Sequence, residues 1–223
     1  MAKFVSNKDE SIRLFKNPVL EFFSHIHPVT PIVVYVPVIA YFGWQGFIHT
    51  ELQWLTIFFM VGVFCWTLME YFLHRFVFHY EPKTSFGKYL LFLSHGIHHD
   101  YPRDSTRLVM PLLASVPIAI ATYILFNVVF GEYHYAAFSG IVFGYVCYDS
   151  IHYAVHHFQM KGRIGSFLKI YHLKHHYSDD HSGYGVSNPL WDYIFGTVPK
   201  RTKPTETVVT ASEKQNSVQE EKI

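Results

Sequence analysis

Long stretches without a charged residue constrain the fold of this 223-residue chain more than any other feature. Uncharged runs occupy residues 31–48, 52–69 and 109–130, and a fourth run, at 135–148, continues its helical pattern to about residue 155. A helix needs about 20 apolar residues to cross the hydrocarbon core of a bilayer. The alternative is a buried hairpin in a soluble protein, but so short a chain leaves little protein to surround four such runs. The sequence therefore predicts an all-α integral membrane protein with four transmembrane helices, at residues 31–48, 52–70, 109–130 and 135–155.

Short connections join these predicted helices in pairs. Residues 49–51 separate the first two and residues 131–134 separate the last two, so we expect two helical hairpins. None of the 18 Lys and Arg residues lies at either hairpin tip. Loops rich in Lys and Arg stay on the cytoplasmic side of a membrane. The pattern predicts a multi-pass protein whose two termini and middle segment are cytoplasmic, in the endoplasmic reticulum of a eukaryote or the inner membrane of a bacterium.

The composition excludes several other classes of protein. Only 16% of the residues are charged, against about 25% in soluble proteins, and the net charge of +1 gives no reason to expect a nucleic-acid partner. Cys65 and Cys147 both lie inside apolar runs, which does not suit a disulfide framework or a thiolate metal site. Residues 204–223 are polar with no apolar period, so we expect a disordered tail there.

Histidine is the second unusual feature, with 16 residues that lower the mean hydropathy of a half-hydrophobic chain to +0.12. Residues four apart share one face of a helix, so His152 and His156 can bind one metal ion. In each HxxHH motif the last two histidines differ by about 100° around the helix and can face two different metals. His74 and His79 are five apart, so we expect them to bind different ions unless the helix ends there. Ten histidines fall in four such clusters: His74 and His79; His95, His98 and His99; His152 and His156; and His172, His175 and His176.

All four clusters fall on the predicted cytoplasmic side, so they can converge into one site. Ten imidazoles are too many for one ion and suit two ions, of zinc, copper, iron or nickel. Glu70 and Asp149 precede two of the clusters, and we expect them to orient imidazole N–H groups, with plain helix-end charges as the alternative. His157 and His181 are less favoured as ligands. The other histidines are expected to be structural: His25, His27, His49 and His134.

The order HX4H, HX2HH, HX3H, HX2HH resembles that of the membrane-bound fatty acid hydroxylase and sterol desaturase superfamily. Three further stretches resemble its fatty acid 2-hydroxylase branch. They are HPVTPIVVYVPV at residues 27–38, YDSIHYAVHH at 148–157 and GYGVSNPLWDYIFGT at 183–197. The resemblance covers roughly residues 15 to 200 of the sequence.

This resemblance implies a hydroxylase domain, here residues 1–203, whose transmembrane helices are capped by a cytosolic helical layer with a dimetal centre. It implies O₂-dependent hydroxylation at the 2-position of a long-chain fatty acid, free or within a sphingolipid. By position, the ten clustered histidines match the family's metal ligands. Tyr145, Tyr148 and Asp149 fall where the family places residues near the substrate channel, and they are the candidate catalytic residues. Many relatives carry an N-terminal cytochrome b5 domain. Since about 28 residues precede the first span, we expect a separate electron donor, such as cytochrome b5 or a ferredoxin with its reductase.

The expected chemistry favours iron, because hydroxylation of an unactivated C–H bond needs a redox metal. Zinc has no redox chemistry, so zinc in a purified sample would be a substitute. A carotenoid or sterol hydroxylase or desaturase is the alternative within the superfamily, since those enzymes share the histidine clusters. A membrane metal transporter is the more distant alternative, but a transporter needs polar ligands at mid-membrane depth.

Overall fold

The computed structural model describes residues 5–200, and every regular element in that range is helical. The predicted tail at residues 204–223 lies outside the described residues. Two π-helices, at Leu73–Phe78 and Phe92–Gly96, and a 3₁₀ turn at Gly131–Tyr133 interrupt the α-helical elements. The α-helices are α1 (Pro18–Ser24), α2 (Thr30–His49), α3 (Leu52–Phe72), α4 (Ser85–Leu91), α5 (Ile97–Asp100), α6 (Leu112–Phe130), α7 (His134–His157), α8 (Arg163–Tyr177) and α9 (Leu190–Phe195).

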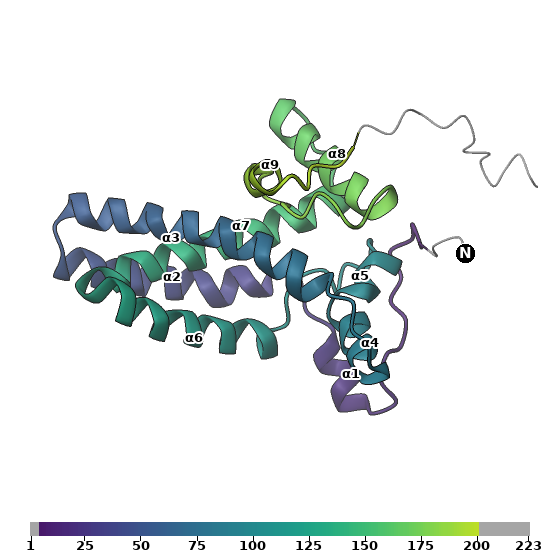
Figure 1. Cartoon of the computed structure of the whole chain (residues 1–223). Helices are drawn as coiled ribbons and strands as arrows, with labels where there is room; N and C mark the ends of the chain where they lie inside the picture. Colours follow the sequence, from purple (N-terminus) through teal and green to yellow (C-terminus); the bar gives the residue numbers. More distant parts are fainter. Residues whose placement is uncertain (1–4, 201–223) are drawn as a thin grey trace, which may run out of the picture.

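Four long helices, α2, α3, α6 and α7, form one body, and the shorter helices gather at one end of it (Figure 1). Three stretches are long and apolar enough to cross a membrane: Thr30–His49, Leu52–Phe78 and Leu112–His157. The third has 46 residues and contains α6, the 3₁₀ turn and α7. The helix predicted from residue 109 begins at Leu112 instead, because Pro111 holds an extended conformation at its N-cap.

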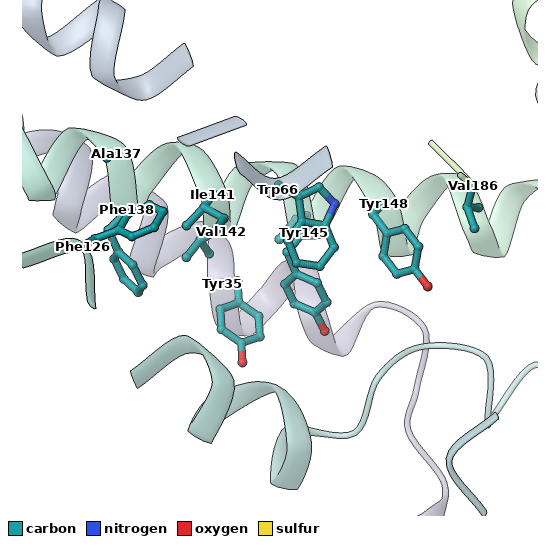
Figure 2. Close-up of a cluster of buried hydrophobic side chains, with 11 residues drawn as sticks. Tyr35, Trp66, Phe126, Ala137, Phe138, Ile141, Val142, Tyr145, Tyr148 and Val186 are labelled. Atoms are coloured by element: carbon teal, nitrogen blue, oxygen red, sulfur yellow. The ribbon is translucent and has the colours of Figure 1, made fainter. Parts of the chain in front are cut away.

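Helix α7 is the centre of this body and packs against α2, α3 and α6. Its approach to α3 is close because both helices place glycine at the crossing. A Cβ atom at Gly140 would lie 2.0 Å from the carbonyl oxygen of Phe59, and one at Gly62 would lie 2.0 Å from that of Ala137. Aromatic side chains fill the space beyond the glycines, with Tyr35, Trp66 and Tyr145 packed together along α7 (Figure 2).

The N-terminal segment fixes the middle segment beside the long helices. The backbone N–H of Ser6 donates to the carbonyl oxygen of Asp100 at 2.8 Å, and that of Ile26 donates to Thr106 at 2.7 Å. The guanidinium of Arg107 forms an ion pair with Glu21 at 2.8 Å. Desolvation acts to raise the pKa of the Glu21 carboxyl, but hydrogen bonds from the Phe15 backbone, His25 and the Leu14 backbone, with a smaller effect of Arg107, together lower it to about 2, so it stays charged. These contacts position α5, which carries two of the clustered histidines.

Candidate metal centre

The structure brings all ten clustered histidines together and sorts them into two groups of five. Within each group the candidate ligand nitrogens all lie within 4.8 Å of one another. Nine of the ten side chains are buried, and His79 is partly exposed. The His74 group consists of His74, His79, His95, His99 and His175. The His152 group consists of His98, His152, His156, His172 and His176.

Helix geometry explains most of this sorting. Each pair of histidines four residues apart stays within one group: His152 with His156, and likewise the first and last residues of both HxxHH motifs. The adjacent pairs divide, with His98 in one group and His99 in the other. Adjacent residues differ by about 100° around a helix, and for this reason adjacent histidines lie in different groups.

His74 and His79 both belong to the His74 group, so they do not face different ions; the exception expected for a helix that ends there applies. The chain between them is a π-helix at Leu73–Phe78, and it ends at His79. The backbone N–H of His79 donates to the carbonyl oxygen of His74 at 3.1 Å. This hydrogen bond between residues five apart is the π-helical pattern, and it brings the two imidazoles to one side of the turn.

The imidazole nitrogens converge in the way that metal ligands do. In the His74 group the Nε2 atoms of His95 and His99 are 3.0 Å apart. In the His152 group the Nε2 atom of His172 lies 2.9 Å from that of His156 and 3.0 Å from that of His176. A metal ion binds imidazole at about 2.0–2.1 Å, so ligands on opposite sides of it lie about 4 Å apart. The spacing in both groups fits one ion in each.

Several of the converging imidazole nitrogens have no hydrogen-bond partner within the described residues. The Nε2 atoms of His74, His98, His152 and His175 are buried without a hydrogen-bond partner. Leaving buried polar atoms unpaired costs free energy, so an arrangement of this kind needs a ligand to explain it. Neutral nitrogen donors without thiolates suit zinc, iron, copper or nickel rather than calcium or magnesium.

Burial keeps the imidazoles in the neutral form that binds metals. Desolvation lowers the pKa of His98 to about 3, with a smaller effect of His79 in the same direction. Desolvation first, and neighbouring histidines second, also hold the pKa values of His95, His172 and His176 well below the usual 6.5. The lone pairs of these residues are therefore available at neutral pH.

Two backbone carbonyl groups orient histidines of the His74 group. The Nδ1 atom of His74 donates to the carbonyl oxygen of Tyr184 at 2.6 Å, and that of His175 donates to Ser182 at 2.8 Å. A carbonyl oxygen only accepts hydrogen bonds, so both Nδ1 atoms carry the proton and both Nε2 atoms carry the lone pair. The second nitrogen of a metal-binding histidine is commonly held in this way.

The expected role of Glu70 in orienting an imidazole directly is wrong. Its carboxylate accepts hydrogen bonds from the backbone N–H groups of Val186 at 2.6 Å and Ser187 at 2.8 Å, and from the Ser187 hydroxyl. The sequence reasoning also did not identify Asp192, which is fully buried and accepts from the backbone N–H groups of Tyr184 at 3.0 Å and Gly185 at 2.8 Å. The only sign of these contacts in the sequence is the resemblance of residues 183–197 to a 2-hydroxylase segment.

Of the three candidate catalytic residues, only Tyr148 contacts the His152 group among the interactions that the structure describes. An apolar cleft between α2, α3, α6 and α7 is lined by Tyr145 and Trp66. The ring of Trp66 lies 5.5 Å from that of Tyr148, which stacks on His152 at 5.6 Å between centroids. Tyr145 and Tyr148 extend from the same side of α7 (Figure 2). Asp149 is buried beside the Tyr145 hydroxyl and the Met110 backbone rather than against an imidazole.

The remaining histidines lie outside both groups, as far as the structure describes the chain. His157 stacks on Tyr153 with their centroids 4.3 Å apart, and His181 is exposed beside Glu81 and Asp180. The histidines expected to be structural make hydrogen bonds elsewhere, for example from His134 to the carbonyl oxygen of Gly131 at 2.6 Å and between His25 and the Thr106 hydroxyl at 2.8 Å.

Comparisons with known proteins agree with the site. The sequence profile of the family described as fatty acid hydroxylase matches residues 59–197. The Arabidopsis thaliana dihydroceramide fatty acyl 2-hydroxylase FAH2 is 35% identical over 85% of this chain and 81% of its own length. The ceramide very long chain fatty acid hydroxylase SCS7 of Saccharomyces cerevisiae is 40% identical over 74% of this chain, but the match spans only 44% of that protein.

A mammalian relative and a solved structure extend the comparison. Human fatty acid 2-hydroxylase is 33% identical over 84% of this chain and 56% of its own length. A structure of full-length scs7p, in which only the hydroxylase domain is visible, superposes with a TM-score of 0.80 at 37% identity. It covers 87% of this chain and 74% of the other. Since the family profile covers more than half of the chain, and close relatives agree with it, the chain belongs to the fatty acid hydroxylase family.

Proposed function

We propose that this oxidoreductase hydroxylates the 2-position of long-chain fatty acids or of the acyl chain of sphingolipids. The observation that carries the proposal is a row of ring contacts that joins the apolar cleft to the His152 group: Trp66 lines the cleft and contacts Tyr148, which stacks on His152. The relatives, which include a dihydroceramide fatty acyl 2-hydroxylase and a fatty acid 2-hydroxylase, support the substrate class.

The cleft provides the binding site for the part of the acyl chain nearest its polar end. Its walls are almost entirely apolar and include Met69, Ile118 and Val142 from three different helices. Burial of each methylene group of an acyl chain is favourable by about 0.8 kcal/mol. The polar end of the lipid then lies near the hydroxyl groups of Tyr145 and Tyr148, which donate hydrogen bonds to its carboxylate or amide oxygen. This arrangement brings the adjacent carbon, the 2-position, toward the His152 group.

Each histidine group holds one metal ion, and iron is the functional metal. The ligands of the first ion come from the His74 group and those of the second from the His152 group. When bound, the irons supply the redox chemistry: one O₂, two electrons and two protons convert a C–H bond into C–OH and release one water. The electrons come from an external donor protein. The buried histidines exclude bulk water, and the two tyrosines and Asp149 position the substrate.

The long helices α2, α3, α6 and α7 cross the membrane, and the histidine-bearing elements form a layer on its cytoplasmic side. The support is the absence of Lys and Arg from the turns at residues 49–51 and 131–134. Side chains such as Val128, which is 80% exposed, face the surrounding lipid. The hydroxylase domain covers residues 1–203. The electron donor then approaches from the cytoplasm.

The test is lipid analysis of a host that lacks its own 2-hydroxylase. Expression of the chain with a cytochrome b5 and its reductase should produce 2-hydroxy acyl species, in free fatty acids or in sphingolipids. The matched control is the His156→Ala variant, which should accumulate in the membrane to the same level without product. Wild-type protein with bound iron and a working electron donor that yields no 2-hydroxy lipid would contradict the proposal.

A further inference from the structure

The loop between α8 and α9 packs the ring of Tyr184 against the His74 group, but its hydrogen bonds to that group come from its backbone. The carbonyl oxygens of Ser182 and Tyr184 accept the Nδ1 protons of His175 and His74. These two carbonyl oxygens stay within hydrogen-bond distance of the imidazoles only if the loop keeps its conformation. The groups that hold residues 182–187 in place therefore determine how both imidazoles are oriented.

Asp192 holds this loop from the α9 side. Each of its two carboxylate oxygens accepts one backbone hydrogen bond: Oδ1 from the N–H of Tyr184 at 3.0 Å, and Oδ2 from the N–H of Gly185 at 2.8 Å. Oδ1 also accepts from the hydroxyl of Thr197 at 2.7 Å. The carboxylate has no solvent exposure, so water cannot replace these bonds.

Glu70 holds the loop from the α3 side. It lies four residues before His74 and is only 3% exposed. Its Oε1 atom accepts from the N–H groups of Val186 and Ser187, and its Oε2 atom accepts from the Ser187 hydroxyl. Glu70 and His74 lie on one continuous helical stretch, and both form hydrogen bonds with the backbone of the same loop, His74 at Tyr184 and Glu70 at Val186 and Ser187.

We propose that Glu70 and Asp192 are positioning residues that keep the metal of the His74 group bound, by holding the carbonyl oxygens of Ser182 and Tyr184 against His175 and His74. This inference rests on the proposed function, which assigns one metal to each histidine group. Among the described residues, no hydrogen bond joins the His152 group to residues 182–187. The metal of the His152 group therefore does not depend on the loop. The loop acts on one metal of the two.

The two carboxylates respond differently to conversion into an amide. In the Glu70→Gln variant the amide oxygen still accepts from both backbone N–H groups, and the new NH₂ group donates to Ser187, whose hydroxyl can accept as well as donate. In Asp192→Asn the new NH₂ group must face a backbone N–H of Tyr184 or Gly185, which can only donate. The first substitution should preserve the loop and the second should break it.

The experiment counts zinc ions on the purified, metal-stripped full-length chain in detergent. Zinc serves as a probe because it binds imidazole and has no redox chemistry, so the count is independent of enzyme activity. Titration against a chelator gives the affinity of each site, and mass spectrometry gives the number of ions. Wild type and Glu70→Gln should bind two zinc ions tightly. Glu70→Leu and Asp192→Asn should keep one tight ion and bind the other about 10–100-fold more weakly.

Double variants identify which ion is weakened. Glu70→Leu combined with His175→Ala should still retain one tight ion, because both changes affect the His74 group. Glu70→Leu combined with His152→Ala should retain none. Thr67→Val is the matched control, because Thr67 lies on α3 like Glu70 and also accepts a hydrogen bond, from the Trp191 indole at 3.0 Å. The substitution removes this hydrogen bond and leaves the contacts of the loop carbonyl groups in place. It should bind two ions.

Three results would overturn the inference. One is two tight ions on Asp192→Asn, and another is an equal loss at both sites in a variant that keeps its helical circular dichroism. The third is the same loss in Glu70→Gln as in Asp192→Asn, which decides the question even if Glu70→Leu fails to fold. Wild type with two zinc ions but, when loaded with iron, no 2-hydroxy product would contradict the proposed function and leave the zinc comparison intact. Fewer than two ions on wild type would contradict the two-metal assignment itself.

Discussion

The His74 group and the His152 group contain the same number and kind of side chain but are held differently. In the His74 group a loop carbonyl oxygen fixes the Nδ1 atom of both His74 and His175. In the His152 group the Nδ1 atoms of His152, His172 and His176 are buried without a hydrogen-bond partner in the described part of the chain. This group is held by its helices and is joined to the apolar cleft through Tyr148 and the cleft-lining Trp66. Two sites of identical composition can therefore differ in rigidity and in access to substrate.

Removal of one ligand from either group is expected to have the largest effect, and it tests whether the groups differ in importance. His156→Ala and His175→Ala should each reduce formation of 2-hydroxy lipid by at least about 100-fold, because loss of a ligand weakens one metal and the reaction needs both. The measurement is product per unit of membrane protein. Full activity in His175→Ala would show that only the His152 group takes part in the chemistry.

Acid should destabilise the metal-free protein through the feature that the two groups share, which is burial. Desolvation holds the pKa of His98 at about 3, whereas an unfolded histidine titrates near 6.5. The unfolded state therefore binds a proton first, and stability is complete above pH 6.5 and is lost as the pH falls toward 3. Each such histidine contributes a slope of about 1.4 kcal/mol per pH unit.

Thermal unfolding of the metal-stripped protein between pH 8 and pH 5 measures this slope. The melting temperature should fall as the pH is lowered below 6.5. The His98→Gln variant, which removes one titrating imidazole, should show a smaller dependence on pH. A melting temperature that stays constant over this range would contradict neutral, buried imidazoles in both groups.

A change at the crossing of α3 and α7 should disturb both groups together. Gly140→Ala places a methyl group 2.0 Å from the carbonyl oxygen of Phe59, so the helices must move apart. Overpacking of this kind costs about 1–3 kcal/mol. We expect a lower melting temperature and a parallel weakening of both zinc sites. The control is Val128→Ala, which changes an exposed side chain on α6 and leaves the crossing intact.

The smallest expected effect is on kcat/KM, from removal of a tyrosine hydroxyl group beside one histidine group or the other. Tyr148→Phe removes a hydroxyl group beside the His152 group and should reduce kcat/KM about tenfold, the equivalent of one hydrogen bond to substrate. Tyr184→Phe is the matched change beside the His74 group. It keeps the backbone carbonyl that holds His74 and should leave activity and zinc binding unchanged. Equal losses in the two variants would contradict the assignment of substrate to the His152 side.

Much of the site could be predicted because it depends on local spacing. The pairing of His152 with His156 and the separation of His98 from His99 follow from the helical repeat alone. His74 and His79 could not be sorted in this way, because a local change to π-helical hydrogen bonding alters the angle between them. No single-residue preference in that stretch reveals the change.

The sequence by itself determined an all-helical chain with long apolar helices and ten histidines grouped for metal binding. These properties are local, since they arise from charge-free length and from helical periodicity. Only the tertiary structure decided which five histidines share a group, and that Glu70 and Asp192 bind a loop rather than an imidazole. Those contacts join residues more than a hundred positions apart in the case of Glu70, and their partners are backbone N–H groups. Every residue except proline carries such a group, so no pattern of side chains in the sequence could identify which ones a buried carboxylate would bind.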